Sequence, residues 1–139
     1  MIVSEIMHKP TFVDSMSTVT DTAKIMCEKN IASVIVGSAT DSKGILTERD
    51  VIKKVVAGGI DPKTTLVKNV MHPAVVTINE NASVQDAVKL LMTHYIRHLP
   101  VSDDSGKVVG MVSARTVMDA LGRLYVSERR RRSSRPPSF

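Results

Sequence analysis

The sequence is poor in aromatic side chains, contains one cysteine and has no long apolar run. Aromatic residues make up 3% of the 139 residues and tryptophan is absent, so the core must be built from aliphatic residues and methionine. So few aromatic rings argue against a platform for stacking nucleic-acid bases. No apolar run approaches the roughly 20 residues that span a bilayer, and Glu5 and His8 interrupt any secretory pattern at the N-terminus. We therefore expect a cytoplasmic protein without a membrane span.

The residues typical of metal sites and catalytic centres are also scarce. Cys27 is the only cysteine and cannot form an internal disulfide, which fits a reducing compartment. It lies in an apolar helical stretch, so we expect it in the core rather than as a nucleophile. His8 and His72 repeat within "MH", but no HExxH, Cys/His cluster, catalytic triad or Gly-rich phosphate loop is apparent. The sequence thus predicts no metal site, no resident cofactor and no enzyme.

Positive charge is concentrated near the C-terminus. The formal net charge is +5, which equals the contribution of five arginines: Arg129, Arg130, Arg131, Arg132 and Arg135. The rest of the chain is therefore neutral. Residues 126–139 lack apolar periodicity and include two consecutive prolines, which predicts a flexible basic tail. This tail is either a solubilising end or an electrostatic contact for nucleic acid, an acidic protein or a neighbouring subunit.

An internal repeat organises the remainder of the chain. The stretch "TVTDTAKIM" matches "SVQDAVKLL", "NIASVIV" matches "YIRHLPV", and "KGILTERDVI" matches "VGMVSARTVM". "EIMHKP" near the N-terminus likewise resembles "NVMHP". A repeat of this length is one structural unit that stacks against its neighbour to complete a core. We therefore assign residues 1–60 to a first repeat and residues 61–125 to a second.

The sequence of each repeat predicts the same order of elements, β-α-β-β-α. Thr18 and Ser83 each precede an aspartate by three residues, which is a signal for a helix N-terminus. Apolar residues then follow helical spacing, and short β-branched runs and turns come next. The predicted strands are 11–13, 31–37, 44–47, 75–77, 98–102 and 108–112, and the predicted second helices are 48–57 and 114–125. Strands this short need helices on one face and a partner repeat, which predicts an α+β fold.

The repeated order of these motifs resembles a pair of CBS domains, the cystathionine-β-synthase-type repeat, also called a Bateman module. The resemblance covers about residues 2–122, and "YIRHLPV" followed by "GKVVGMVS" is a particularly specific part. It implies two repeats packed sheet to sheet with pseudo-twofold symmetry and two clefts between them. It also implies a stand-alone regulatory module for energy or metabolite sensing, not a catalyst, that binds AMP, ADP, ATP or S-adenosylmethionine. Such modules commonly form homodimers, and the protein partner that this one would regulate is unknown.

One repeated phrase differs between the repeats at a carboxylate. "GILTERD" ends in Asp50, whereas "GMVSART" ends in Thr116. Taken alone, the first phrase is a capping box, in which Thr47 accepts from the amide of Asp50 and Asp50 reaches back. That interpretation does not explain the second phrase, because Ser113 remains as a cap although the acid is lost. Starting a helix therefore does not require an acid at this position.

The resemblance implies a function for the difference. In similar modules the acid accepts hydrogen bonds from both ribose hydroxyls, and charge-assisted bonds of this kind are strong. Thr47 and Asp50 would therefore hold a ribose well, whereas the second cleft would hold it weakly. The resemblance also places a basic residue of the partner repeat at the phosphate, which gives Arg97 and His98 here. The alternative for these two residues is a solvated strand end without a ligand.

Neighbouring residues complete both candidate clefts on the same resemblance. The first, nucleotide-binding cleft comprises Thr47, Asp50, Arg97, His98, Ile45, Leu46, Ile96, Lys68, His72 and Pro73. The weaker second cleft comprises Ser113, Thr116, Ser4, Pro10, Ile31 and Ala32. Three hypotheses remain open: a nucleotide-sensing module, a nucleic-acid-associated dimeric scaffold acting through the arginines, and a structural module with empty clefts.

Overall fold

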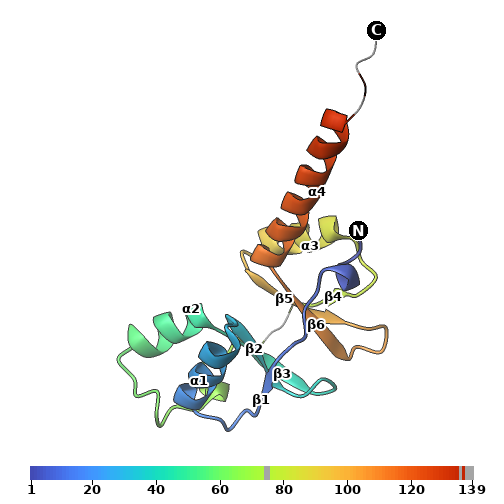
Figure 1. The fold of residues 1–139 in the computed structure, drawn as a ribbon. Helices are drawn as coiled ribbons and strands as arrows, with labels where there is room; N and C mark the ends of the chain where they lie inside the picture. The colour runs from blue at the N-terminus through green and yellow to red at the C-terminus, as the bar shows by residue number, and fades with distance from the viewer. Residues whose placement is uncertain (74–75, 135, 137–139) are drawn as a thin grey trace.

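Two three-stranded sheets, one from each repeat, form the centre of the molecule (Figure 1). The computed structural model describes residues 1–73, 76–134 and 136. The strand orders are β1-β2-β3 and β4-β5-β6, and in each sheet the first pair is parallel and the second antiparallel. The predicted α+β class and the two-repeat organisation are confirmed.

The elements follow the predicted order closely. The first repeat contains β1 (Phe12–Val13), α1 (Val19–Lys29), β2 (Ser33–Gly37), β3 (Ser42–Thr47), α2 (Glu48–Asp50) and the π-helical turn η2 (Val51–Val56). The second contains β4 (Ile78–Asn79), α3 (Val84–Thr93), β5 (His98–Ser102), β6 (Val108–Ser113) and α4 (Ala114–Ser134). Two short 3-10 turns, η1 (Val3–Glu5) and η3 (Val67–Asn69), lie near the start of the two repeats. The strand predicted at 75–77 begins later, at 78, and residues 74–75 lie outside the described residues.

The two repeats begin their first helices in the same way. The amide of Asp21 donates to Thr18 Oγ1 at 3.2 Å, and the amide of Asp86 donates to Ser83 Oγ at 3.0 Å. Each bond satisfies one of the backbone donors that a helix N-terminus leaves unpaired. Asn30 ends α1 in the left-handed conformation, with φ of 52°. The helix signals in the sequence are therefore confirmed at the atomic level.

Alternation along the strands divides the apolar side chains between three clusters. Val34, Val36 and Leu46 face the helices of the first repeat and are fully buried. Ile35 and Ile45 point the other way and pack against Val108 and Met111 of the second repeat. Successive strand residues face opposite sides of a sheet, so each sheet has a helix face and a face toward the other repeat. The sheet-to-sheet packing implied by the family resemblance follows from this pattern.

The repeats exchange their leading segments. Val3 of η1 lies in the core of the second repeat, and Val67 of η3 lies in the core of the first. His8 pairs by its backbone with Met111, and His72 pairs with Ile45. Figure 1 accordingly shows the N-terminus beside α3 and β4, away from α1. In space, each repeat therefore includes a segment from the other half of the chain.

Gly44 and Gly110 allow the exchanged segments to approach the sheets. A Cβ atom at Gly44 would collide with the backbone carbonyl oxygen of His72. A Cβ atom at Gly110 would collide with the side chain of Met7. Glycine suits positions where another chain segment lies this close to the backbone. The glycine that opens both copies of the phrase thus has a packing role.

The C-terminal segment differs from its prediction. Residues 126–134 continue α4 rather than forming a flexible tail, and α4 projects from the body in Figure 1. Arginine and glutamate favour helices, and Glu128 pairs with Arg132 at 3.3 Å one turn away. Within α4 only Val117 is buried, so this extension is exposed. Arg135 lies outside the described residues.

The expectation that Cys27 is a core residue is wrong. The buried face of α1 consists of Val19, Thr22 and Met26, and Cys27 is exposed. Each helical step turns the side chain by roughly 100°, which carries the residue after Met26 out of the core. In the part of the chain that the structure describes, no helix is long and apolar enough to cross a bilayer.

Candidate functional site

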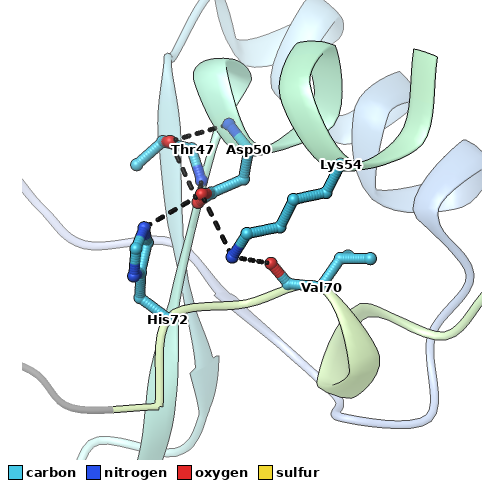
Figure 2. Close-up of polar contacts among 5 residues, drawn as sticks. All are labelled: Thr47, Asp50, Lys54, Val70 and His72. Atoms are coloured by element: carbon cyan, nitrogen blue, oxygen red, sulfur yellow. Dashed lines mark hydrogen bonds and ion pairs between the residues drawn. The ribbon is translucent and has the colours of Figure 1, made fainter. Parts of the chain in front are cut away.

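Asp50 is the only buried charged side chain among the described residues, with 4% of its surface exposed. It lies in the first turn after β3. The backbone amide and hydroxyl of Thr47 both donate to Asp50 Oδ2, at 2.9 and 3.0 Å, and the amide of Asp50 donates to Thr47 Oγ1 at 3.2 Å. Figure 2 shows this arrangement. The predicted capping box is confirmed, and it fixes the carboxylate in one orientation.

The second oxygen of Asp50 faces two basic side chains. His72 Nε2 lies 3.1 Å from Asp50 Oδ1, and Lys54 Nζ lies 3.6 Å from the same oxygen (Figure 2). Lys54 Nζ also donates to the carbonyl oxygen of Val70 at 2.9 Å. The exchanged segment that carries Val70 and His72 thereby closes over the carboxylate. The site combines the end of β3, the helical turns after it and the lead of the second repeat.

Lys54 was not among the residues predicted from the sequence. Its spacing of four residues from Asp50 is a signal that could have identified it, because side chains four apart lie on one helix face. The contact with Val70 could not have been anticipated, since it depends on the exchange of segments between the repeats.

The equivalent position in the second repeat contains hydroxyl groups instead. Ser113 Oγ and Thr116 Oγ1 share a hydrogen bond at 2.9 Å, and the amide of Thr116 donates to Ser113 Oγ at 3.1 Å. His8 occupies the position that corresponds to His72, because both residues pair with the third strand of a sheet. His8 Nδ1 lies 3.2 Å from the carbonyl oxygen of Lys9. The two repeats therefore share the hydroxyl cap, whereas the carboxylate and its partner Lys54 are found in the first repeat and Thr116 and Ala120 in the second.

His98, in the second repeat, lies close enough to Asp50 to interact with it electrostatically. It opens β5 opposite Ser113, as Ser33 opens β2 opposite Thr47. Burial lowers the pKa of His98 from its ordinary value, and the nearby carboxylates Glu48 and Asp50 oppose this shift. Both carboxylates belong to the first repeat, so His98 acts across the boundary. At neutral pH the lowered pKa favours the uncharged imidazole.

Arg97 lies beside His98 with an exposed side chain. Its carbonyl oxygen accepts from the amide of Ala114 at 2.9 Å, as Ala32 accepts from Glu48 at 3.0 Å. The two pairs confirm that Arg97 and Ala32 occupy corresponding positions. The cationic residue is thus found in one repeat and a small apolar residue in the other.

Several other candidate residues of the first cleft do not converge on Asp50. Ile45 faces the packing between the sheets, whereas Leu46 is fully buried on the helix side. Ile96 packs against the core of the second repeat. Lys68 and Pro73 are exposed. The expectation that the Leu46 side chain contacts a ligand conflicts with this placement, because adjacent strand residues face opposite sides.

The candidates for the second cleft are similarly dispersed. Ile31 packs against the first core, and the amide of Ser4 donates to the carbonyl of Glu80 at 2.9 Å. Pro10 and Ala32 are half-buried at the start of their strands. Among residues 1–73, 76–134 and 136, no three histidine, cysteine or acidic side chains are grouped to hold a metal ion.

Comparison with curated sequences gives one long match and several short ones. An uncharacterized protein of Methanocaldococcus jannaschii is 44% identical over 112 residues, which cover 80% of this chain and 57% of that protein. The L-aspartate semialdehyde sulfurtransferase of the same organism is 39% identical over 57 residues, covering 41% of this chain and 11% of the enzyme. The chain thus spans about a tenth to just over half of these relatives.

Comparison with solved structures identifies the same fold throughout. A CBS-domain protein of Burkholderia ambifaria matches with a TM-score of 0.80 and 30% identity, covering 87% of this chain and 93% of that one. A hexameric CBS-CP12 protein of bloom-forming cyanobacteria matches with a TM-score of 0.79 and 31% identity, covering 86% and 71%. A CBS domain pair solved with 5′-methylthioadenosine and S-adenosyl-L-methionine matches with a TM-score of 0.78 and 24% identity, covering 88% and 96%.

The family profile of the CBS domain matches this sequence twice. The matched residues are 3–57 and 67–123, which coincide with the two repeats and leave the distal part of α4 outside. Together with the two exchanged segments and the paired sheets, these matches show that the chain belongs to the CBS-domain family.

Proposed function

We propose that this protein is a regulatory, non-catalytic module that binds an adenosine nucleotide in the cleft at Asp50. The observation that carries the proposal is a buried carboxylate held by Thr47 and lying within the electrostatic range of His98 in the other repeat. A carboxylate suits a ribose because it can accept hydrogen bonds from two neighbouring hydroxyl groups.

The other parts of the nucleotide have matching groups at the first cleft. Ile45 offers an apolar contact for the base near the packing between the sheets. Arg97 supplies a permanent positive charge for a phosphate, and His98 can donate a hydrogen bond to it. Ala32 and Ser33 occupy the corresponding positions in the other repeat and provide no charge. Asp50 in the first repeat would therefore accept from the ribose, and Arg97 and His98 in the second repeat would contact the phosphate, all in the same cleft.

The ligands of a related fold support the chemical class. The CBS domain pair noted above contains 5′-methylthioadenosine and S-adenosyl-L-methionine, which share an adenosine group. That likeness is of fold, so the choice of AMP, ADP, ATP or S-adenosylmethionine for this protein rests on its own residues. We favour a nucleotide with a phosphate because of Arg97 and His98. The second cleft, with Ser113 and Thr116, would bind the same ligands more weakly.

A homodimer is the assembly that we propose for this module. Val56 and Ile52 are 71% and 60% exposed on η2, beside a groove of about 480 Å³ between α1 and η2. On the second repeat, Met92 and Met118 are each 71% exposed on α3 and α4. Apolar side chains gathered on a surface commonly mark an interaction site. The nucleic-acid hypothesis for Arg129–Arg132 gains no support from the fold or from the relatives.

Calorimetric titration with AMP, ADP, ATP and S-adenosylmethionine tests the proposed function. The wild-type protein should bind at least one of them near one ligand per chain. If Asp50 makes two charge-assisted bonds worth about 2–3 kcal/mol together, Asp50→Ala should weaken binding by about 30- to 150-fold. Thr116→Ala is the matched control, because it removes the corresponding side chain of the weaker cleft and should change this affinity little. Equal affinities in the wild type and Asp50→Ala would refute the assignment.

A further inference from the structure

Both oxygens of Asp50 already have donors. Oδ2 accepts from the amide and hydroxyl of Thr47, and Oδ1 lies 3.1 Å from His72 Nε2 and 3.6 Å from Lys54 Nζ. The two oxygens of an ionised carboxylate offer about four acceptor positions. The two Thr47 donors and His72 occupy three of them, so a ribose diol, which needs two, can bind fully only if one of these donors leaves.

His72 is the donor that can leave most readily. The contacts of Thr47 form the capping box, so breaking them would disturb the start of the helix. Lys54 is held by a second bond to the carbonyl oxygen of Val70 at 2.9 Å. The His72 side chain is 60% exposed, and its backbone is fixed separately by pairing with Ile45. The imidazole can thus rotate into solvent without any change in the sheet.

We propose that His72 competes with the ribose for Asp50 and that protonation of His72 strengthens this competition. This inference rests on the proposed function and concerns the regulation of the same cleft. A charged imidazolium forms an ion pair with the carboxylate, whereas a neutral imidazole offers only an uncharged hydrogen bond. Histidine side chains gain or lose their charge near neutral pH. Acidification should therefore weaken ribose binding through His72.

Other charged groups lie around the carboxylate and around His98. Lys54 on η2 is 3.6 Å from Asp50 Oδ1, and Glu48 on α2 and Arg97 before β5 act electrostatically on His98. His98 and, close to it, His8 are the other histidines here: burial lowers the pKa of His98, and the charge of His8 adds to this lowering. Protonation of His98 would favour a phosphate, so its effect on nucleotide binding has the opposite sign. A ligand without a phosphate removes this opposing contribution.

The second repeat contains a matched control for His72. His8 occupies the same position relative to its sheet, but Thr116 replaces the carboxylate there. His8 therefore has no corresponding acid with which to pair. Substitution of His8 therefore removes the equivalent histidine of the second repeat but leaves the contact between His72 and Asp50 intact.

The test is the affinity for adenosine at about pH 6 and about pH 8, with AMP titrated in parallel. Because the imidazole partner of this ion pair is exposed, the gain should be small, and wild-type protein should bind adenosine about two- to fivefold more weakly at the lower pH. His72→Gln should bind adenosine with the same affinity at both pH values. This affinity should equal that of the wild type at the higher pH. His72→Ala, which lacks any donor, should bind at least as tightly as His72→Gln. His8→Gln should behave as wild type.

Three results would overturn the proposal. If His72→Gln keeps the wild-type pH dependence, another group causes it. If His72→Gln and His72→Ala bind more weakly than wild type at both pH values, His72 contacts the ligand instead of competing with it. Each of these results leaves the proposed function intact provided that wild type binds AMP. If wild type binds neither AMP nor adenosine at either pH, the proposed function fails and the competition fails with it.

Discussion

At the scale of single residues, Asp50 differs from its counterpart Thr116 in charge rather than in position. Both residues lie three positions after a hydroxyl cap, and both amides donate to that cap, at 3.2 and 3.1 Å. A helix N-terminus favours an acid by a few tenths of a kcal/mol to about 1 kcal/mol. The second repeat forms its helix without this contribution. The buried carboxylate instead has partners beyond the helix cap, because its second oxygen faces His72 and Lys54.

His98 makes the stability of the fold depend on pH. Burial lowers the pKa of His98 in the folded state, whereas an unfolded histidine titrates near about 6.5. Its contribution to stability is therefore fully present above that value and is lost as the pH falls toward the lowered folded pKa. Urea unfolding at about pH 7.5 and about pH 5.5 should show a smaller loss of stability for His98→Gln than for wild type.

The exposed His94 provides the control for that measurement. His94→Gln should lose as much stability on acidification as wild type, because its side chain is exposed at the end of α3. If His98→Gln and His94→Gln behave identically, the burial of His98 has no consequence for folding.

Local patterns predicted the residues whose partners are close in sequence. Thr47 and Asp50 interact across three residues, and a capping box is defined by that spacing. Leu46 was expected near the base of the ligand, whereas alternation turns its neighbour Ile45 toward the other repeat and buries the Leu46 side chain in the core. Cys27 was expected in the core, but it lies one residue after the buried Met26 and is exposed. An error of one position reverses the direction of a strand side chain and turns a helix side chain by roughly 100°. The burial of a residue is therefore harder to predict than the helix or strand that contains it.

At the scale of elements, the approach of each leading segment to a sheet depends on one glycine. A Cβ at Gly44 would meet the backbone of His72, which cannot move without breaking its pairing with Ile45. A Cβ at Gly110 would meet the side chain of Met7, which is flexible. Overpacking typically costs 1–3 kcal/mol. We expect Gly44→Ala to lower the free energy of unfolding by about this amount and Gly110→Ala by less.

Urea denaturation of the two alanine variants measures this difference. Equal destabilisation by both substitutions would contradict the distinction between a backbone and a side-chain obstacle.

The order and type of the elements were predictable, but their partners were not. The internal repeat and the helix-cap residues predict the element order β-α-β-β-α in both halves of the chain. The exchange of η1 and η3 was not predictable, because both repeats contain similar segments and nothing local decides which core each one joins. The extension of α4 was missed because the serines and arginines of 126–134 were judged by composition rather than by helix propensity. The first error concerns contacts between distant segments, and the second concerns the local propensity of one helix.

At the scale of the whole molecule, the exposed apolar side chains predict self-association. Val56 is 71% exposed beside the groove between α1 and η2, so Val56→Asp should change the stability of a monomer little. A charge buried in an interface is costly, so the same substitution should shift a dimer toward monomer. Sedimentation velocity should give a dimer for wild type and for the exposed control Asn81→Asp. A monomeric wild type would contradict the predicted homodimer.

The packing of the two sheets gives a ligand a way to influence the whole molecule. A nucleotide that contacts Asp50 in one repeat and Arg97 in the other would favour the packing that aligns these groups. A ligand shifts a conformational equilibrium only by its difference in affinity between the states. The proposed regulatory role therefore depends on the contact between ribose and carboxylate more than on any other.

Titration of wild type and Asp50→Ala with AMP and 2′-deoxy-AMP tests that contact most directly. One missing hydroxyl removes one charge-assisted bond, so wild type should bind AMP about tenfold more tightly than 2′-deoxy-AMP. In Asp50→Ala the preference should disappear, because the acceptor of the hydroxyl is gone. A preference of the same size in both proteins, or none in wild type, would contradict the assignment of Asp50 to the ribose.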